Sequence, residues 1–118
     1  MSFNVIDNPG FTKFQKNAGF KNSEFRALAS LYAQAASHRA LYDMAVDVDF
    51  DDGTCTITYY LSNSYKPYLQ FVILHVGPRS AMYEVFKEGK GKIIRSGLFD
   101  RAFDRLREEV HALMPSSE

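Results

Sequence analysis

The sequence predicts a single α+β domain in which a five-stranded antiparallel meander sheet packs between an N-terminal helical segment and a C-terminal helix. Two observations carry this prediction. Residues 46–95 show strand-like apolar patterns between two stretches of helical spacing, and strands and helices do not alternate as they do in parallel sheets. A chain of 118 residues also has the commonest size for one domain. We therefore expect one core over residues 3–114 and a frayed tail at 115–118.

The composition is that of an ordinary globular protein. Hydrophobic residues make up 46% of the chain, and 14 basic residues balance 14 acidic ones, so no net charge steers it toward nucleic acid or an anionic membrane. The only cysteine, Cys55, cannot form an intrachain disulfide, and the first residues lack the pattern of a signal peptide. The longest apolar run, 71–74, is far too short to cross a bilayer. These features predict a cytoplasmic protein with no membrane partner.

Two helical segments are predicted before the sheet. A short helix lies between Asn8, a good capping residue followed by Pro9, and Gly19, which can end a helix in the left-handed conformation. A longer helix follows from about Ser23 to Tyr42. Its apolar residues cover a broad arc, which predicts contact on two sides. The members of this arc are Phe25, Leu28, Ala29, Leu31, Tyr32, Ala35, Ala36 and Ala40, with Arg39 among them.

The first hairpin is predicted from Asp52-Gly53, a favoured two-residue turn. Folding the chain about this turn gives an apolar face on which Phe50 pairs with Cys55, Val48 with Ile57, and Val46 with Tyr59. The other face then pairs Asp49 with Thr56, and Asp47 with Thr58.

The strand Leu69–Val76 is apolar at both odd and even positions, which predicts a central strand buried on both sides. A second hairpin, 82–87 with 92–95, is predicted around Gly89 and Gly91. The final helix should run from about Leu98 to Met114. Its single apolar stripe consists of Phe99, Ala102, Phe103, Leu106, Val110 and Leu113.

No metal or cofactor site is predicted. The acidic run that starts at Asp47 differs from a calcium-binding loop, because the sixth and twelfth positions hold Asp52 and Thr58 where glycine and glutamate are needed. The run 89–92 lacks the spacing of a phosphate-binding loop. Cys55 and His75 could form a thiol–imidazole pair, but no third residue that would orient the histidine is identifiable.

Three groups of residues are candidates for function. Arg39 and three tyrosines near the loop after the second strand, Tyr60, Tyr65 and Tyr68, are candidates for ligand or partner contacts. A cluster of bases on the second hairpin could contact RNA or an acidic partner, and it consists of Lys87, Lys90, Lys92 and Arg95. Catalytic candidates are His75 and Tyr59.

The preferred hypothesis is a non-catalytic domain that binds a protein or a small molecule and acts as a homodimer. It rests on surplus apolar surface, since one helix covers only one face of a sheet whose central strand is apolar on both. One alternative is a small enzyme with a pocket between sheet and long helix, using His75 for proton transfer together with Tyr59 and Arg39. The other alternative is a nucleic-acid-associated module that uses the basic hairpin, residues 87–95.

Overall fold

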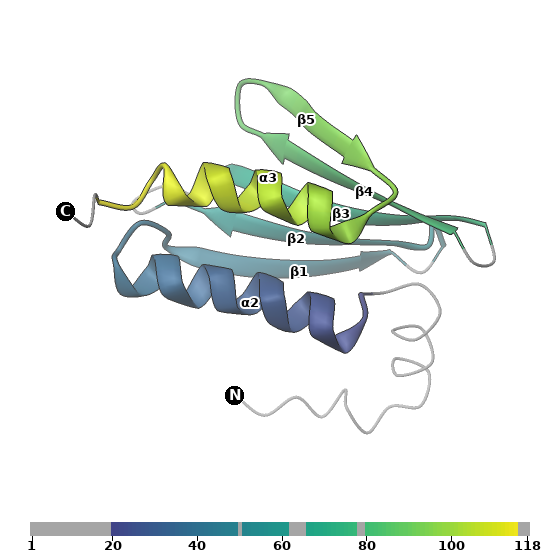
Figure 1. The fold of residues 1–118 in the computed structure, drawn as a ribbon, viewed down its shortest axis with the longest axis horizontal. Helices are drawn as coiled ribbons and strands as arrows, with labels where there is room; N and C mark the ends of the chain where they lie inside the picture. The colour runs from purple at the N-terminus through teal and green to yellow at the C-terminus, as the bar shows by residue number, and fades with distance from the viewer. Residues whose placement is uncertain (1–19, 50, 62–65, 78–79, 116–118) are drawn as a thin grey trace.

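The computed structural model describes residues 20–49, 51–61, 66–77 and 80–115. Its elements are α2 (Asn22–Ser37), β1 (Asp43–Asp49), β2 (Thr54–Tyr60), β3 (Pro67–Gly77), β4 (Ser80–Lys87), β5 (Gly91–Ser96) and α3 (Phe99–His111). The strands form one antiparallel sheet in the order β1-β2-β3-β4-β5, so each strand pairs with the next one along the chain (Figure 1). The predicted α+β class and meander sheet are thus confirmed. The predicted short helix lies outside the described residues.

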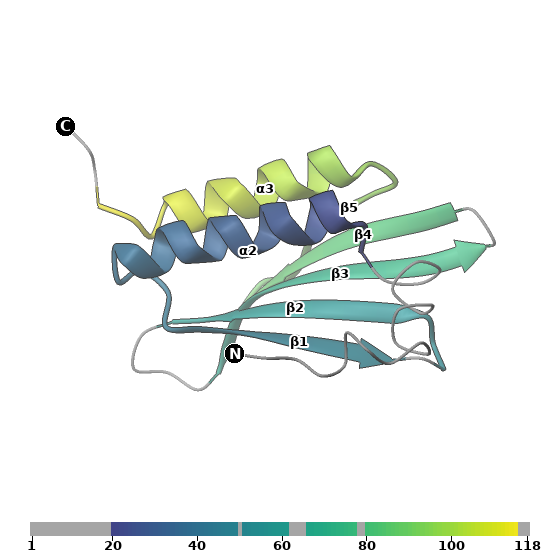
Figure 2. The same ribbon diagram turned by 90° about the horizontal axis from the view of Figure 1, so that it is seen from below.

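Both described helices cover the same face of the sheet, so the prediction that the sheet lies between the long helix and the final helix is wrong. Figure 2 shows α2 and α3 side by side on one side of the strands. Each helix presents one buried stripe, exemplified by Leu28 on α2 and Leu106 on α3. The face that they share carries the large apolar residues of three adjacent strands, and this surface is wide enough for two helices. We call it the helix face, and the opposite side of the sheet the open face.

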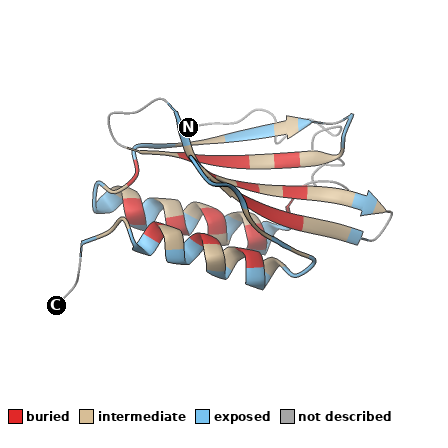
Figure 3. Cartoon of the chain, turned by 90° about the horizontal axis from the view of Figure 1, so that it is seen from above, coloured by how far each residue is buried: buried red, intermediate tan, exposed pale blue. Residues whose placement is uncertain are grey.

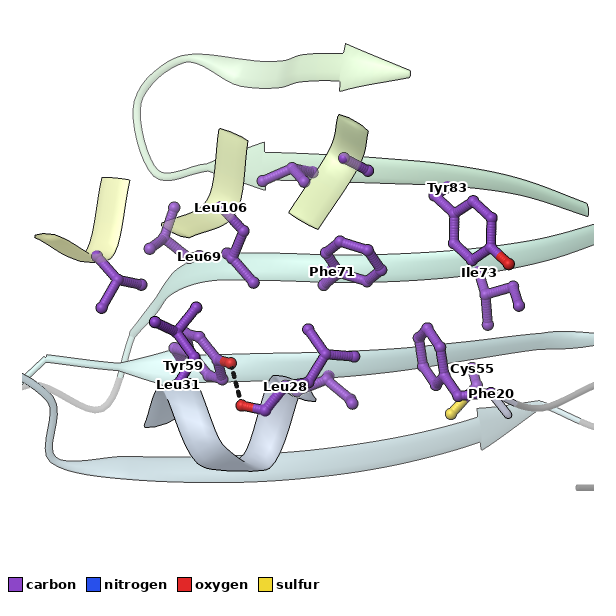
Figure 4. Packing of buried hydrophobic residues seen from close by; sticks show 14 of the residues in the cluster. Phe20, Leu28, Leu31, Cys55, Tyr59, Leu69, Phe71, Ile73, Tyr83 and Leu106 are labelled. Carbon is purple, nitrogen blue, oxygen red and sulfur yellow. Dashed lines mark hydrogen bonds between the residues drawn. The ribbon is translucent and has the colours of Figure 1, made fainter. Parts of the chain in front are cut away.

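The core lies between the helix face and the two helices (Figures 3 and 4). Phe71 of β3 sits at its centre, with ring centroids 5.8 Å from Phe20, 6.1 Å from Tyr83 and 5.5 Å from Phe99. These tilted and edge-on contacts are the favoured geometries for aromatic pairs. Chain segments from the start, the middle and the end of the described residues therefore meet at one aromatic cluster.

The first hairpin has the predicted faces but not the predicted register. Val48 pairs with Cys55 and Val46 with Ile57, two residues away from the expected partners on β1. Because the shift is even, every side chain stays on its predicted face. The turn differs because Asp49 Oδ1 accepts hydrogen bonds from the N–H groups of Asp51 and Asp52, at 3.0 and 3.1 Å. These bonds stabilise a connection longer than two residues.

Helix α2 ends at Ser37, five residues before the predicted end at Tyr42. Arg39 has a φ of 59° and lies in the turn after the helix, not on the apolar arc. Its N–H donates to the Ala36 carbonyl and the Ala40 N–H to the Ala35 carbonyl, both at 2.9 Å. This pair of bonds is the Schellman motif, in which the left-handed position is usually glycine. The sequence pattern missed it because arginine stands there.

Strand β3 is central, as predicted, but only one of its sides is buried. Leu69, Phe71 and Ile73 point toward the helices and are at most 2% exposed. On the open face Val72 is partly exposed and Val76 is 56% exposed. In the described part of the chain the expectation of burial on both sides is therefore wrong, because α2 and α3 both cover the same face. The second hairpin and the apolar stripe of the last helix are confirmed.

Candidate functional site

The described helices leave the open face of the sheet uncovered. Strand register orders its residues in rows that run from β1 to β5. The central row is Asp47, Thr56, Val72, Glu84 and Arg95. The row on one side is Asp49, Thr54, Leu74 and Met82, and the row on the other side is Ala45, Thr58, Gln70, Phe86 and Lys92.

These rows give the open face a charge pattern. Its β1 margin holds Asp47 and Asp49, which we call the acidic margin, and its β5 margin holds Lys92 and Arg95, which we call the basic margin. All four side chains are exposed. Between the margins lie threonines on β2 and mainly apolar side chains on β3 and β4.

Among the described residues that lie between the two margins of the open face, Glu84 is the one with a charge, and it is only 5% exposed. Its Oε2 accepts from Lys92 Nζ at 3.0 Å and lies 3.3 Å from a terminal nitrogen of Arg95. Both cations are themselves exposed, so water screens the attraction and each pair stabilises the hairpin only modestly. The sequence signal for this site is a glutamate at i±2 from Met82 and Phe86, which places an acid on an apolar face.

The basic hairpin carries less unmatched charge than its composition suggests. Lys87 Nζ lies 2.8 Å from Glu109 on α3 and 6.0 Å from the centre of the Tyr68 ring. The contact with Glu109 raises the pKa of Lys87, which points away from the open face. Within the described ranges, Lys90 is the only one of the four predicted bases without an ion pair. Nucleic-acid binding by this hairpin stays a prediction.

The candidate tyrosines are not gathered at one place. Tyr60 lies on the open face at the end of β2, whereas Tyr68 lies beside Lys87, next to the turn of the second hairpin. Tyr65 lies outside the described residues. Tyr59 is buried on the helix face, and its hydroxyl donates to the Leu28 carbonyl of α2 at 2.6 Å (Figure 4). Burial raises the pKa of Tyr59 well above its usual range.

The catalytic candidates lie far apart. Tyr59 pairs with Leu69 of β3, and His75 is six residues further along that strand, about 20 Å at the usual strand rise. Arg39 lies at the opposite end of the sheet from His75, since the segment after it joins β1 beside Tyr60. The structure thus does not bring the three residues together, and their catalytic roles stay predictions.

Cys55 and His75 share the helix face near the first hairpin. Cys55 pairs with Ile73, and the His75 N–H donates to the Gly53 carbonyl at 3.2 Å. Burial, and to a lesser degree the charge of Asp47, raise the pKa of the Cys55 thiol to about 11, which disfavours the reactive thiolate. His75 Nε2 is buried and has no hydrogen-bond partner among the described residues.

Among residues 20–49, 51–61, 66–77 and 80–115, no three acidic, histidine or cysteine side chains are grouped as metal ligands. Neither described helix has the length and apolar character needed to cross a membrane. No protein-family model matches the chain, and neither the curated proteins nor the solved structures contain a match.

Proposed function

We propose that the chain is a non-catalytic protein-interaction domain that acts as a homodimer joined through the open face of its sheet. The observation that carries this proposal is the position of α2 and α3 on a single face. A sheet that turns one side to water normally shows polar residues there. Here the open face carries apolar side chains on β3 and β4, namely Val72, Leu74, Val76, Met82 and Phe86.

The open face has the size of a small protein interface. Strands lie about 4.8 Å apart and rise about 3.3 Å per residue, so five strands of about six residues span roughly 24 Å by 20 Å, or roughly 480 Å². A standard interface buries about 800 Å² of accessible surface on each partner. Accessible surface exceeds the flat outline because side chains protrude, so the two areas are comparable.

A second copy suits this surface better than a strongly charged partner. The chain has no net charge, so two copies do not repel each other at long range. The open face also carries both an acidic and a basic margin. In a twofold-symmetric contact the acidic side chains of each copy can therefore pair with the basic side chains of the other.

The experiment is the solution mass of the full chain, measured by sedimentation equilibrium over micromolar concentrations. We expect twice the chain mass of 13.4 kDa. Val76→Lys should raise the dimer dissociation constant about tenfold or more, because an ammonium group would be desolvated in the contact. A matched control is Val46→Lys, since Val46 is similarly exposed, 45% against 56%, but lies on the helix face.

Two results would overturn the proposal. One is a monomer at tens of micromolar. The other is a dimer that both valine variants leave equally strong, which would place the contact elsewhere.

A further inference from the structure

We propose, on the basis of the homodimer above, that two copies stack their open faces about a twofold axis parallel to β3, so that the acidic margin of each copy lies against the basic margin of the other. The margins are those defined above: Asp47 and Asp49 on β1, and Lys92 and Arg95 on β5.

Symmetry restricts how two identical faces can stack, and two simple orientations follow from the strand order. A twofold axis that runs along the strands exchanges the two margins, because β1 of one copy lies over β5 of the other. An axis across the strands instead places β1 over β1 and β5 over β5. In that second orientation Asp47 meets Asp47 and Arg95 meets Arg95, and like charges that face each other across an interface disfavour the contact. The charge pattern therefore selects the axis along the strands.

The middle of the face is compatible with the same axis. β3 is the third of five strands, so it lies over itself and Val72, in the centre of its row, meets Val72 of the second copy. β2 then lies over β4, which sets Thr56 of each copy near Glu84 of the other. A threonine hydroxyl can donate to a carboxylate, so Glu84 gains a further donor beside Lys92 and Arg95 of its own copy.

Arg95 can contact a second carboxylate without giving up the first. One terminal nitrogen lies 3.3 Å from Glu84, and a guanidinium has five N–H donors, so further donors are left for Asp47 of the second copy. Arg95 and Lys92 are exposed at the rim, where interfaces are polar and partly hydrated. We therefore expect these pairs to set orientation and partner choice more than affinity.

The decisive experiment removes one charge and measures the dimer dissociation constant of the full chain by sedimentation equilibrium. In the proposed orientation Asp47→Asn removes an attraction to Arg95, so the dissociation constant should rise about threefold to tenfold. In the other orientation the same change removes a repulsion, so the dissociation constant should fall. Glu108→Gln is the matched control, because Glu108 is an exposed acid on α3, away from the open face.

A charge exchange provides the second arm. Asp47→Lys and Arg95→Glu should each weaken the dimer, and the double variant should recover part of the wild-type affinity, because lysine then meets glutamate across the contact. Recovery should be incomplete, because Arg95→Glu also removes the ion pair with Glu84 within each copy. Recovery supports the proposed axis. If the double variant loses at least as much dimer affinity as the two single variants lose together, the margins do not meet and the orientation is wrong.

Failure of the orientation can be told apart from failure of the homodimer. A monomeric wild-type chain overturns both proposals. In another outcome the wild-type chain is a dimer, Val76→Lys weakens it and Asp47→Asn strengthens it. The open face is then still the interface, and only the axis along the strands is overturned. Thermal unfolding of each variant checks that it is folded.

Discussion

The hydroxyl of Tyr83 donates a hydrogen bond to Glu24 Oε2 at 2.9 Å and thereby joins β4 to the first turn of α2. The other oxygen of Glu24 accepts from the Lys21 N–H at 3.0 Å, at the start of the helix. Both Tyr83 and Glu24 are 7% exposed. One buried carboxylate therefore caps the helix and fixes it to the sheet.

This contact predicts a loss of stability in alkali. Burial, and then the hydrogen bond and charge of Glu24, raise the pKa of Tyr83 above its usual value of 10.0. The unfolded chain ionises this tyrosine first, so its contribution is fully present below about pH 10 and is lost as the pH rises beyond that value. Tyr83→Phe should cost about 1–3 kcal/mol at pH 7, because Glu24 loses a donor, and should flatten the decline above pH 10. Urea unfolding at pH 7, 9 and 10.5 measures both effects, and an equally steep decline in the variant would contradict the assignment.

Tyr59 provides a second tie between sheet and helix. Tyr59→Phe removes the 2.6 Å bond from its hydroxyl to the Leu28 carbonyl and keeps the ring in place. We expect a loss of about 1 kcal/mol, the usual net value of such a bond. For a chain of this size the melting temperature should fall by about 3–6 °C in a calorimetric scan. Tyr60→Phe, on the open face, is the control and should change it little. Equal effects of the two substitutions would show that the buried bond contributes nothing measurable.

Arg39 occupies a backbone conformation that suits glycine. Its φ of 59° is costly for a residue with a Cβ, so Arg39→Gly should stabilise the protein by about 1 kcal/mol in urea unfolding. Arg39→Ala is the matched control, since it also removes the arginine side chain but keeps the Cβ. If alanine raises the free energy of unfolding as much as glycine does, the effect comes from loss of the arginine side chain and not from the backbone conformation.

Cys55 should be unreactive in the folded protein. Its pKa of about 11 leaves roughly one thiol in a thousand ionised at pH 8, and the side chain is also 5% exposed. Modification by a thiol reagent at pH 8 should therefore be slow in buffer and complete within minutes in urea. Rapid reaction of the native protein would contradict this prediction and would support the hypothesis of a thiol–imidazole pair between Cys55 and His75.

The helices and strands were predicted well from local sequence patterns, because each pattern depends on residues that are close together along the chain. The meander order, the apolar side of each strand of the first hairpin and the stripe on α3 all follow from alternation or helical spacing. The errors arose where a specific side chain altered a common turn. Asp49 lengthened the first hairpin through its own hydrogen bonds, and Arg39 took the place of glycine at the end of α2.

The choice of face for each helix could not be predicted in this way. Val72 and Leu74 are as apolar as Phe71 and Ile73, so the sequence of β3 alone does not say which side receives both helices. Glu84 was also a weak signal, because its partners Lys92 and Arg95 become neighbours only through the register of the second hairpin. The candidate site therefore emerged from rows across the sheet and not from any motif along the chain.

The meander order has a consequence for how the chain folds. Every strand can find its partner through a hairpin, whereas α2 must be held by residues as distant as Tyr83, 59 positions away from Glu24. Closing a long loop costs more entropy than closing a short one, and contacts over long separations slow folding. The sheet and α3 should thus assemble first, with α2 docking last and detaching most readily.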